Sequence, residues 1–426
     1  MALIEIGSAK QLFLDDYIIE SITDGSRVLN RAEKVENNPI LRPERNWEGN
    51  HIVGQNVIFD SKDRLFKMWY ETHTYNPIKN DDGSIKVAGL DDYAEATTCL
   101  AISSDGFNWE RPSLGLVEFE GSKTNNILPR ESIKKYFFED PQDTDPKKRY
   151  KGLIRKGTTK TPGMTFDLYY SPDGLDWTPC KYNPVIDTSP RVGRWGPTYF
   201  MGWDPIRKVY AAHMENCLHR MSQIGKRMIG RSESPDMITW TDPETIIIPD
   251  SLDTADTEFY AMPTMVYENM YVGILWIFHT TDQTHHPTLV FSRNGVHYDR
   301  TFREPYIQRG GRSDFDNAMV TATSQIVHEG QILTYYNGSN WRAPDTLYEL
   351  GDRGLRAIGL ATTPLDGFVS IDGKKGVSLS PKPETLYSDD PLMAQMTPTE
   401  FLKIAPTSPD TFSQMVTRSF GFTGSQ

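Results

Sequence analysis

The chain has 426 residues and a formal net charge of −12, with 38% hydrophobic and 11% aromatic residues. This length exceeds the ~250–300 residues that one hydrophobic core usually holds, so the chain is either multidomain or distributes its core over a repeat. The negative charge argues against a nucleic-acid-binding protein, which needs a basic surface to displace counterions from phosphates.

The N-terminal residues have neither a basic region nor an uninterrupted apolar stretch. The sequence therefore predicts no signal peptide, no transmembrane helix and no membrane partner, and a cytoplasmic location is expected. The three cysteines lie far apart and lack the spacing of metal ligands, which predicts neither a disulfide framework nor a zinc site.

A strand-like segment followed by a turn and an aromatic residue occurs five times along the chain. The copies are SSDGFNW, YSPDGLDW, ESPDMITW, FSRNGVHY and TTPLDGF, which end at Trp109, Trp177, Trp240, Tyr298 and Phe368. The Asp or Asn of such a turn accepts backbone hydrogen bonds and the next Gly accepts positive φ, as in tight connections between antiparallel strands. A repeat of about 60–70 residues indicates that each copy is one unit packed against its neighbours.

Each unit contains three segments with strand character. In chain order they are GQNVIFD, LFKMWYE and TTCLAIS; KKYFFED, YKGLIRK and FDLYYS; PTYFMGWD, VYAAHME and KRMIGRS; PTMVYEN, MYVGILWIFH and TLVFS; TSQIVHEG, QILTYYNG and RAIGLA. The sequence therefore predicts an all-β protein, a five-bladed β-propeller of antiparallel sheets over residues 1–376.

Two segments lie outside this repeat. Residues 11–20 are a candidate for a strand that closes the ring, with an ordinary edge strand as the alternative. Residues 377–426 mix Pro, Met, Thr and Ser without periodicity. They are predicted to form a C-terminal extension that caps the propeller or is partly disordered.

Antiparallel strands bring the beginning of each first strand and the end of each second strand to the same rim. Four carboxylates at such positions are the catalytic candidates: Glu258 and Asp316 precede inner strands, and Glu71 and Glu215 end second strands. The substrate-binding candidates at this rim are Trp47, His51, Arg155, Arg194, Trp195, His213, Tyr260, His279, Tyr336 and Arg342. The alternatives are solvated carboxylates and core histidines.

Asp60, Asp140 and Asp204 follow first strands instead. They belong to the opposite rim and are predicted to form turns.

A rim with several carboxylates, aromatic rings and arginines suits sugar chemistry. Glycoside cleavage needs a protonated acid beside the leaving oxygen and an ionised carboxylate across the anomeric carbon, while aromatic faces stack on sugar rings. We therefore expect Glu258 to act as general acid and Asp316 or Glu71 as base or nucleophile. The substrate expected is an oligosaccharide or polysaccharide cleaved from its end. No metal or other cofactor is predicted, and a central structural cation is left open.

Several segments give the chain a family resemblance. They are QLFLDDYIIES (11–21), LFKMWYE (65–71), SSDGFNWERP (103–112), EDPQDTDPKKRYKG (139–152), YSPDGLDW (170–177) and GLATTPLDGFVSID (359–372). With them the chain resembles the five-bladed propeller glycoside hydrolases, the group of the fructan and arabinan hydrolases, and most closely the bacterial glycosyl-hydrolase-like proteins. The resemblance implies a propeller fold and glycosidase activity.

The chain also departs from that family's pattern. Known members use three acidic residues, one at the start of each of the first three inner strands. Here the third unit begins with Arg194-Trp195-Gly196-Pro197 and the second offers only Glu131. Residue roles are therefore carried over only to Glu258 and Asp316, on position alone.

The sequence is also compatible with two other functions. One is a non-catalytic carbohydrate-binding propeller, since a fold does not fix a function. The other is a glycoside phosphorylase or an enzyme of acidic glycans, in which Arg155, Lys156, Arg194 and Arg342 would hold phosphate or a uronate. The sequence leaves the sugar, the linkage, the stereochemical course and the oligomeric state open.

Overall fold

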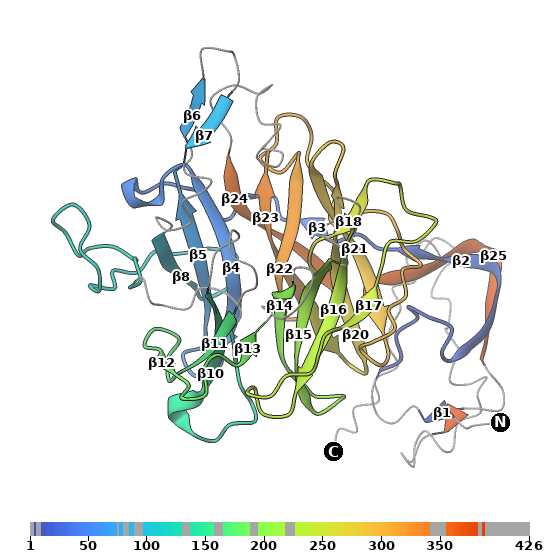
Figure 1. The fold of residues 1–426 in the computed structure, drawn as a ribbon. Coiled ribbons are helices and arrows are strands. Elements are labelled where there is room, and N and C mark those ends of the chain that lie inside the picture. The colour runs from blue at the N-terminus through green and yellow to red at the C-terminus, as the bar shows by residue number, and fades with distance from the viewer. Residues whose placement is uncertain are drawn as a thin grey trace.

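The structure is a computed structural model. It describes residues 4–5, 10–74, 76–79, 85–88, 97–129, 137–156, 165–187, 195–217, 226–340, 355–381 and 386–387. Over these residues the regular structure is β-strand apart from two short 3₁₀ helices, η1 (Asn46–Glu48) and η3 (Pro146–Lys148), so the prediction of an all-β protein is confirmed (Figure 1). Within the same residues, no helix is long and apolar enough to cross a membrane.

The strands follow one another in antiparallel groups that match the units of the sequence repeat. The first group contains β4 (His51–Asp60), β5 (Leu65–His73) and β8 (Thr97–Ser103). The second contains β9 (Phe137–Glu139), β10 (Tyr150–Lys156) and β11 (Thr165–Ser171), with β12 (Thr178–Pro179) and β13 (Ile186–Asp187) beside β11. The third contains β14 (Trp195–Asp204), β15 (Val209–Cys217), β16 (Arg227–Ser234) and β17 (Glu244–Ile247).

The remaining strands complete two further groups and three small pairs. The fourth group contains β18 (Thr257–Phe259) and β19 (Thr264–Tyr267), both paired with β20 (Met270–His279), and then β21 (Thr284–Ser292). The fifth contains β22 (Met319–His328), β23 (Gln331–Ser339), β24 (Arg356–Pro364) and β3 (Glu33–Lys34). The pairs are β2 (Ile19–Leu29) with β25 (Val369–Pro381), β6 (Asn76–Lys79) with β7 (Ile85–Ala88), and β1 (Ile4–Glu5) with β26 (Leu386–Tyr387).

Hydrogen bonds do not divide these strands into five separate sheets. Single parallel residue pairs, His285 with Met319 and His51 with Arg356, join the first, fourth and fifth groups into one eleven-stranded sheet. The joins arise where the ends of neighbouring groups approach closely enough for one backbone pair to form. The count of five blades therefore stays a prediction.

Each group also contacts the next one along the chain, and the fifth contacts the first. Four of these contacts are hydrogen bonds and one is a ring contact: Asn56 Nδ2 to the Phe137 carbonyl (2.9 Å), Phe138 against Phe200 (5.2 Å between centroids), Tyr199 Oη to the Thr264 carbonyl (3.2 Å), Trp276 Nε1 to the Ala322 carbonyl (2.9 Å) and the Val57 amide to Ser324 Oγ (3.0 Å). First strands supply a residue to every one of them.

The repeated turns have the predicted geometry in the first four copies. In the second copy, Asp173 Oδ1 accepts hydrogen bonds from the amides of Leu175 (2.8 Å) and Asp176 (3.0 Å), and Trp177 Nε1 donates to the Gly174 carbonyl (3.0 Å). Equivalent pairs of amide bonds occur at Asp105, Asp236 and Asn294. In the fifth copy, Asp366 Oδ1 accepts a hydrogen bond from Tyr267 Oη at 2.6 Å.

We expect Gly174→Ala to lower the free energy of unfolding by about 1–2 kcal/mol, because Gly174 has a φ of +81°. An added Cβ would also lie 3.0 Å from Cζ2 of Trp69. Gly115→Ala is the control, since Gly115 has a φ of +68° but nothing within 4 Å of an added Cβ. Urea denaturation of both variants measures the effect, and equal losses would contradict a role for the Trp69 contact.

The prediction that Asp60, Asp140 and Asp204 form turns is confirmed. Asp60 Oδ1 accepts from the amides of Lys62 and Asp63 at 3.0 Å each. The three carboxylates have a second role that the sequence reasoning missed, because each accepts a hydrogen bond from a tyrosine of the next group. These bonds are Tyr150 to Asp60 (2.8 Å), Tyr210 to Asp140 (2.9 Å) and Tyr271 to Asp204 (2.8 Å).

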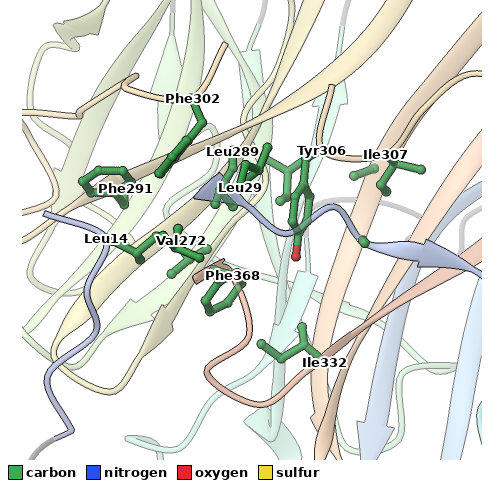
Figure 2. Packing of buried hydrophobic residues seen from close by; sticks show 14 of the residues in the cluster. Leu14, Leu29, Val272, Leu289, Phe291, Phe302, Tyr306, Ile307, Ile332 and Phe368 are labelled. Carbon is green, nitrogen blue, oxygen red and sulfur yellow. The ribbon is translucent and has the colours of Figure 1, made fainter. Parts of the chain in front are cut away.

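The N-terminal segment contributes to the core rather than forming the expected strand at residues 11–20. Leu12 and Leu14 are 1% and 2% exposed and pack in one cluster with Val272, Ile332 and Phe368, which come from the fourth and fifth groups and the turn after β24 (Figure 2). Within residues 11–20 a strand, β2, begins only at Ile19, and β3 is the N-terminal strand that pairs with β24. The segment thus fills the space beside the last two groups.

The predicted boundary at residue 376 falls within a strand. β25 continues to Pro381 and pairs with β2, and Figure 1 shows this ribbon extending away from the other sheets. Most of the predicted extension, residues 377–426, lies outside the described residues.

Candidate active site

A cavity of about 680 Å³ lies where the groups meet, a size typical of small-molecule sites. Aromatic and polar side chains both line it. Its aromatic walls include Phe137, Tyr199, Tyr260 and Trp276, and its polar lining includes Gln55, Glu71, His73, Arg227, His285, Asn337 and Arg356. This mixture of ring faces and hydrogen-bonding groups suits a sugar.

Glu71 is the only carboxylate among the described residues that line the cavity. It lies near the end of β5, opposite Val53 of β4, as predicted from its place at the end of a second strand. Gln55 Nε2 donates a hydrogen bond to Glu71 Oε2 at 2.5 Å. This bond fixes the carboxylate near a second cavity-lining side chain.

Glu215 and Glu258 are brought together by an arginine. Arg227 lines the cavity, and its Nε donates to Glu215 Oε1 at 3.0 Å while its Nη1 donates to Glu258 Oε2. Its guanidinium carbon lies 4.9 Å from the centroid of the Tyr260 ring. Burial would lower the pKa of Arg227, but Tyr260 and the two glutamates outweigh burial and raise it, so the guanidinium stays charged.

A second arginine, Arg356, reaches the cavity from β24. Its Nη2 lies 3.8 Å from Sδ of Met319 at the start of β22, so the side chain extends across the intervening strand β23. His285 lies beside Met319, and His51 lies beside Arg356 in the backbone pairing. Burial, followed by the charge of Arg356, lowers the pKa of each of these histidines to about 3, so both are neutral at pH 7.

Asp316 does not line the cavity, contrary to the expectation that it points there. Its carboxylate is 2% exposed, lies 2.5 Å from Lys34 Nζ and accepts a hydrogen bond from Tyr336 Oη at 2.9 Å. Asn38 Nδ2 donates to the same tyrosine oxygen at 3.2 Å. Lys34 lies on β3, which pairs with β24. The carboxylate of Asp316 therefore binds a residue of the N-terminal segment.

Other predicted substrate-binding residues also lie outside the cavity lining. His213 is fully buried, with Nδ1 2.9 Å from the Met262 carbonyl, and burial lowers its pKa to about 4. His51 is buried as well, and its Nδ1 is 2.6 Å from Asn50 Oδ1. These positions fit the alternative of core histidines.

His279 lies 3.5 Å from Asp256 and stacks on His286, with centroids 5.2 Å apart.

Trp47 lies in η1, away from the lining, and donates from Nε1 to Asn126 Oδ1 at 2.9 Å. Tyr260 is the one predicted substrate-binding residue that lines the cavity within the described part of the chain. Arg194 and Arg342 lie outside the described residues. The backbone of Arg155 lies in β10 and that of Trp195 in β14, and their side chains are not described.

The sequence reasoning missed Arg227 and Arg356, although a signal for them was present. Both begin third strands and open the same short pattern, RMIG at 227–230 and RAIG at 356–359. The start of a third strand pairs with the end of a second strand, Arg227 with Cys217 and Arg356 with Ser339. Third strands therefore supply the same rim, and a long side chain reaches the cavity from there.

Across the residues that the structure describes, no group of three or more His, Cys, Asp or Glu side chains is placed to hold a metal ion.

Comparison with known proteins gives similarity in structure but not in sequence. No model of a known protein family matches the chain, and no curated protein matches it. A β-1,2-mannobiose phosphorylase from Listeria innocua superposes with a TM-score of 0.53 at 12% identity, over 79% of this chain and 97% of that one.

Two other solved structures are similar to a lesser degree. A glycosyl hydrolase from Bacteroides ovatus has a TM-score of 0.49 at 14% identity, over 84% of this chain and 97% of that one. A family 32 β-fructofuranosidase from Bombyx mori has a TM-score of 0.47 at 12% identity, over 82% of this chain and 66% of that one. At 12% identity, the similarity to the phosphorylase concerns the fold alone.

Proposed function

We propose that the protein is a glycoside hydrolase that binds a sugar chain end in the central cavity. In this proposal the five antiparallel groups are the blades of a propeller. The succession of contacts from each group to the next, and from the fifth to the first, supports that arrangement.

The observation that carries the proposal is the position of Glu71 in a cavity walled by aromatic side chains. Aromatic faces cover the apolar faces of a sugar ring, and a carboxylate at the same site can act on the glycosidic oxygen or the anomeric carbon. Glycoside cleavage needs two carboxyl groups. We assign the first to Glu71 and the second to Glu258 or Glu215, which Arg227 holds beside Tyr260.

Glu71→Gln tests this assignment. We expect the kcat/KM for the best substrate of an oligosaccharide panel to fall at least about a hundredfold, because the amide cannot exchange the proton that glycoside cleavage requires. Glu118→Gln is the control, since Glu118 is an exposed glutamate outside the cavity lining. Undiminished turnover by Glu71→Gln would remove Glu71 from the mechanism.

Phosphorolysis is a second candidate, favoured by one observation. The described cavity lining holds two arginines and a single carboxylate. An inverting phosphorylase needs only one protein acid, because phosphate itself attacks the anomeric carbon. The same assay therefore runs with and without inorganic phosphate. Release of free sugar in the absence of phosphate supports hydrolysis, and release of sugar phosphate only when phosphate is present supports phosphorolysis.

A further inference from the structure

The two arginines of the cavity differ in how their charges are balanced. Arg227 donates to Glu215 and to Glu258, so two carboxylates neutralise it. Arg356 forms no ion pair with any described residue, and the one hydrogen bond of its guanidinium to a described residue goes to the weak acceptor Sδ of Met319. One of the two guanidinium groups in the site therefore lacks an anionic partner within the described protein.

The described strand neighbours of Arg356 carry no negative charge. Its neighbours in the strand pairings are His51 and Ser339, and the next residue across β23 is Met319, which lies beside His285. Both histidines are neutral at pH 7, so they neither repel an anion strongly nor replace one. The His285 imidazole and the Ser339 hydroxyl, which both line the cavity, add polar groups that can hydrogen-bond the oxygen atoms of a ligand.

A charge withdrawn from water without a partner is unfavourable, and a bound anion relieves that cost. The guanidinium presents paired N–H groups that match the two oxygens of a carboxylate. Arg356 is half-buried and lines the cavity. Tyr260 and Trp276 of the same lining offer ring faces on which a sugar can stack. A ligand that fills this cavity and balances this charge is a sugar that carries an oxyanion.

We propose that Arg356 binds the carboxylate of a sugar acid, so that the substrate of the cavity is a glycan ending in a uronic acid. This inference rests on the proposed function, because it assigns the substrate class of the same site. Inorganic phosphate carries the same oxyanion chemistry, and the experiment separates the two sources.

The test is isothermal titration calorimetry with matched pairs of sugars: glucuronate with glucose, galacturonate with galactose, and mannuronate with mannose. We expect at least one acid to bind the wild-type protein about tenfold to a hundredfold more tightly than its neutral counterpart, the worth of a charge-assisted hydrogen-bond pair. Arg356→Gln abolishes that preference. Arg356→Lys keeps the positive charge and is expected to retain part of the preference for the acid.

Arg312→Gln is the control, because Arg312 is exposed and outside the lining, and the substitution removes the same charge. Thermal unfolding of each variant establishes that it is folded. Equal binding of acid and neutral sugar, no binding of any acid to folded wild-type protein, or a preference that survives Arg356→Gln would each overturn the proposal. Phosphate that binds in an Arg356-dependent manner, while acids show no advantage, would overturn it in favour of a phosphate site.

Calorimetry measures binding and does not depend on turnover. The catalytic role of Glu71 and the substrate class are therefore tested independently of each other. If Glu71→Gln retains full activity but the acid preference depends on Arg356, the catalytic assignment is wrong and the substrate class stands. If Glu71→Gln is inactive and the acid and neutral sugars bind with equal affinity, the proposed hydrolase activity stands and the proposed substrate class is wrong.

Discussion

Asp204→Ala is expected to lower the free energy of unfolding by about 3–5 kcal/mol, measured by urea denaturation. The carboxylate is fully buried and lies 2.5 Å from Nη2 of Arg231, whose side chain is only 2% exposed. Tyr271 Oη donates to both carboxylate oxygens at 2.8 Å. Removing Asp204 withdraws the main partner of a buried charge and leaves a buried hydroxyl unpaired. Arg231 Nε still donates to Glu233 (2.7 Å), so we expect the lower part of this range.

Two further variants separate the ion pair from the hydrogen bond. Tyr271→Phe removes only the hydroxyl and is expected to lower the free energy of unfolding by about 1 kcal/mol. Asp204→Ala combined with Arg231→Met removes both charges and is expected to be less destabilised than Asp204→Ala alone. If Asp204→Ala were as mild as Tyr271→Phe, the ion pair would contribute little and the interpretation would be wrong.

This effect matters for the whole fold because the same bond recurs between successive groups. Asp60 and Asp204 end first strands and Asp140 directly follows one. Each accepts a hydrogen bond from the tyrosine near the start of the next group's second strand. Each aspartate side chain thereby stabilises its own turn and also binds the neighbouring group through the tyrosine. The bonds lie at the end of the first strands opposite to Glu71, so they maintain the spacing of the strands that surround the cavity.

The sequence predicted the local structure of the repeat well, because local hydrogen bonds determine it. Asp105, Asp173, Asp236 and Asn294 all accept from the two amides that follow them, as turn chemistry requires. Even Met237, which replaces glycine in the third copy, adopts a φ of +68°. The side chain of Met237 is fully buried among core residues, so packing compensates for the less favourable backbone.

How the units join was less predictable, because it depends on contacts between residues far apart in the chain. The pairing of His51 with Arg356 joins residues of the first and last groups, and no local sequence pattern predicts it. The pairing of β3 with β24 is similar, since two residues of the N-terminal segment suffice to place Lys34 beside Asp316. Its place just before an inner strand predicted Asp316 at the cavity, but its carboxylate pairs with Lys34 and Tyr336 instead.

The candidate site shows the same division between local and distant information. The rule that second strands end at the cavity rim selects two glutamates, of which Glu71 lines the cavity and Glu215 does not. Applied also to the beginnings of third strands, the same rule selects Arg227, His285 and Arg356. Side-chain length decides which of these positions reach the cavity, and Arg356 spans a whole strand to do so.

Asp60→Asn is expected to lower the free energy of unfolding by about 2–3 kcal/mol at pH 7, with a loss that shrinks as the pH falls below about 4. Burial alone would raise the pKa of Asp60, but hydrogen bonds from Arg149, Lys67 and Tyr150 outweigh it and hold the pKa well below its usual range. Because the folded state favours the ionised form, this carboxylate stabilises the fold above its unfolded pKa, and the contribution is lost as the pH falls toward the folded pKa. Asparagine has no charge to lose.

Urea denaturation of both proteins between pH 7 and pH 3 measures this convergence. The wild-type protein is expected to lose more stability over that interval than Asp60→Asn does, because all other carboxylates are common to both. Lys67 and Arg149 are 12% and 17% exposed, so water partly solvates them once Asp60 is neutral, which keeps the loss below that expected for Asp204→Ala. A difference between the two proteins that stayed constant with pH would show that the ionised form of Asp60 is not what stabilises this contact.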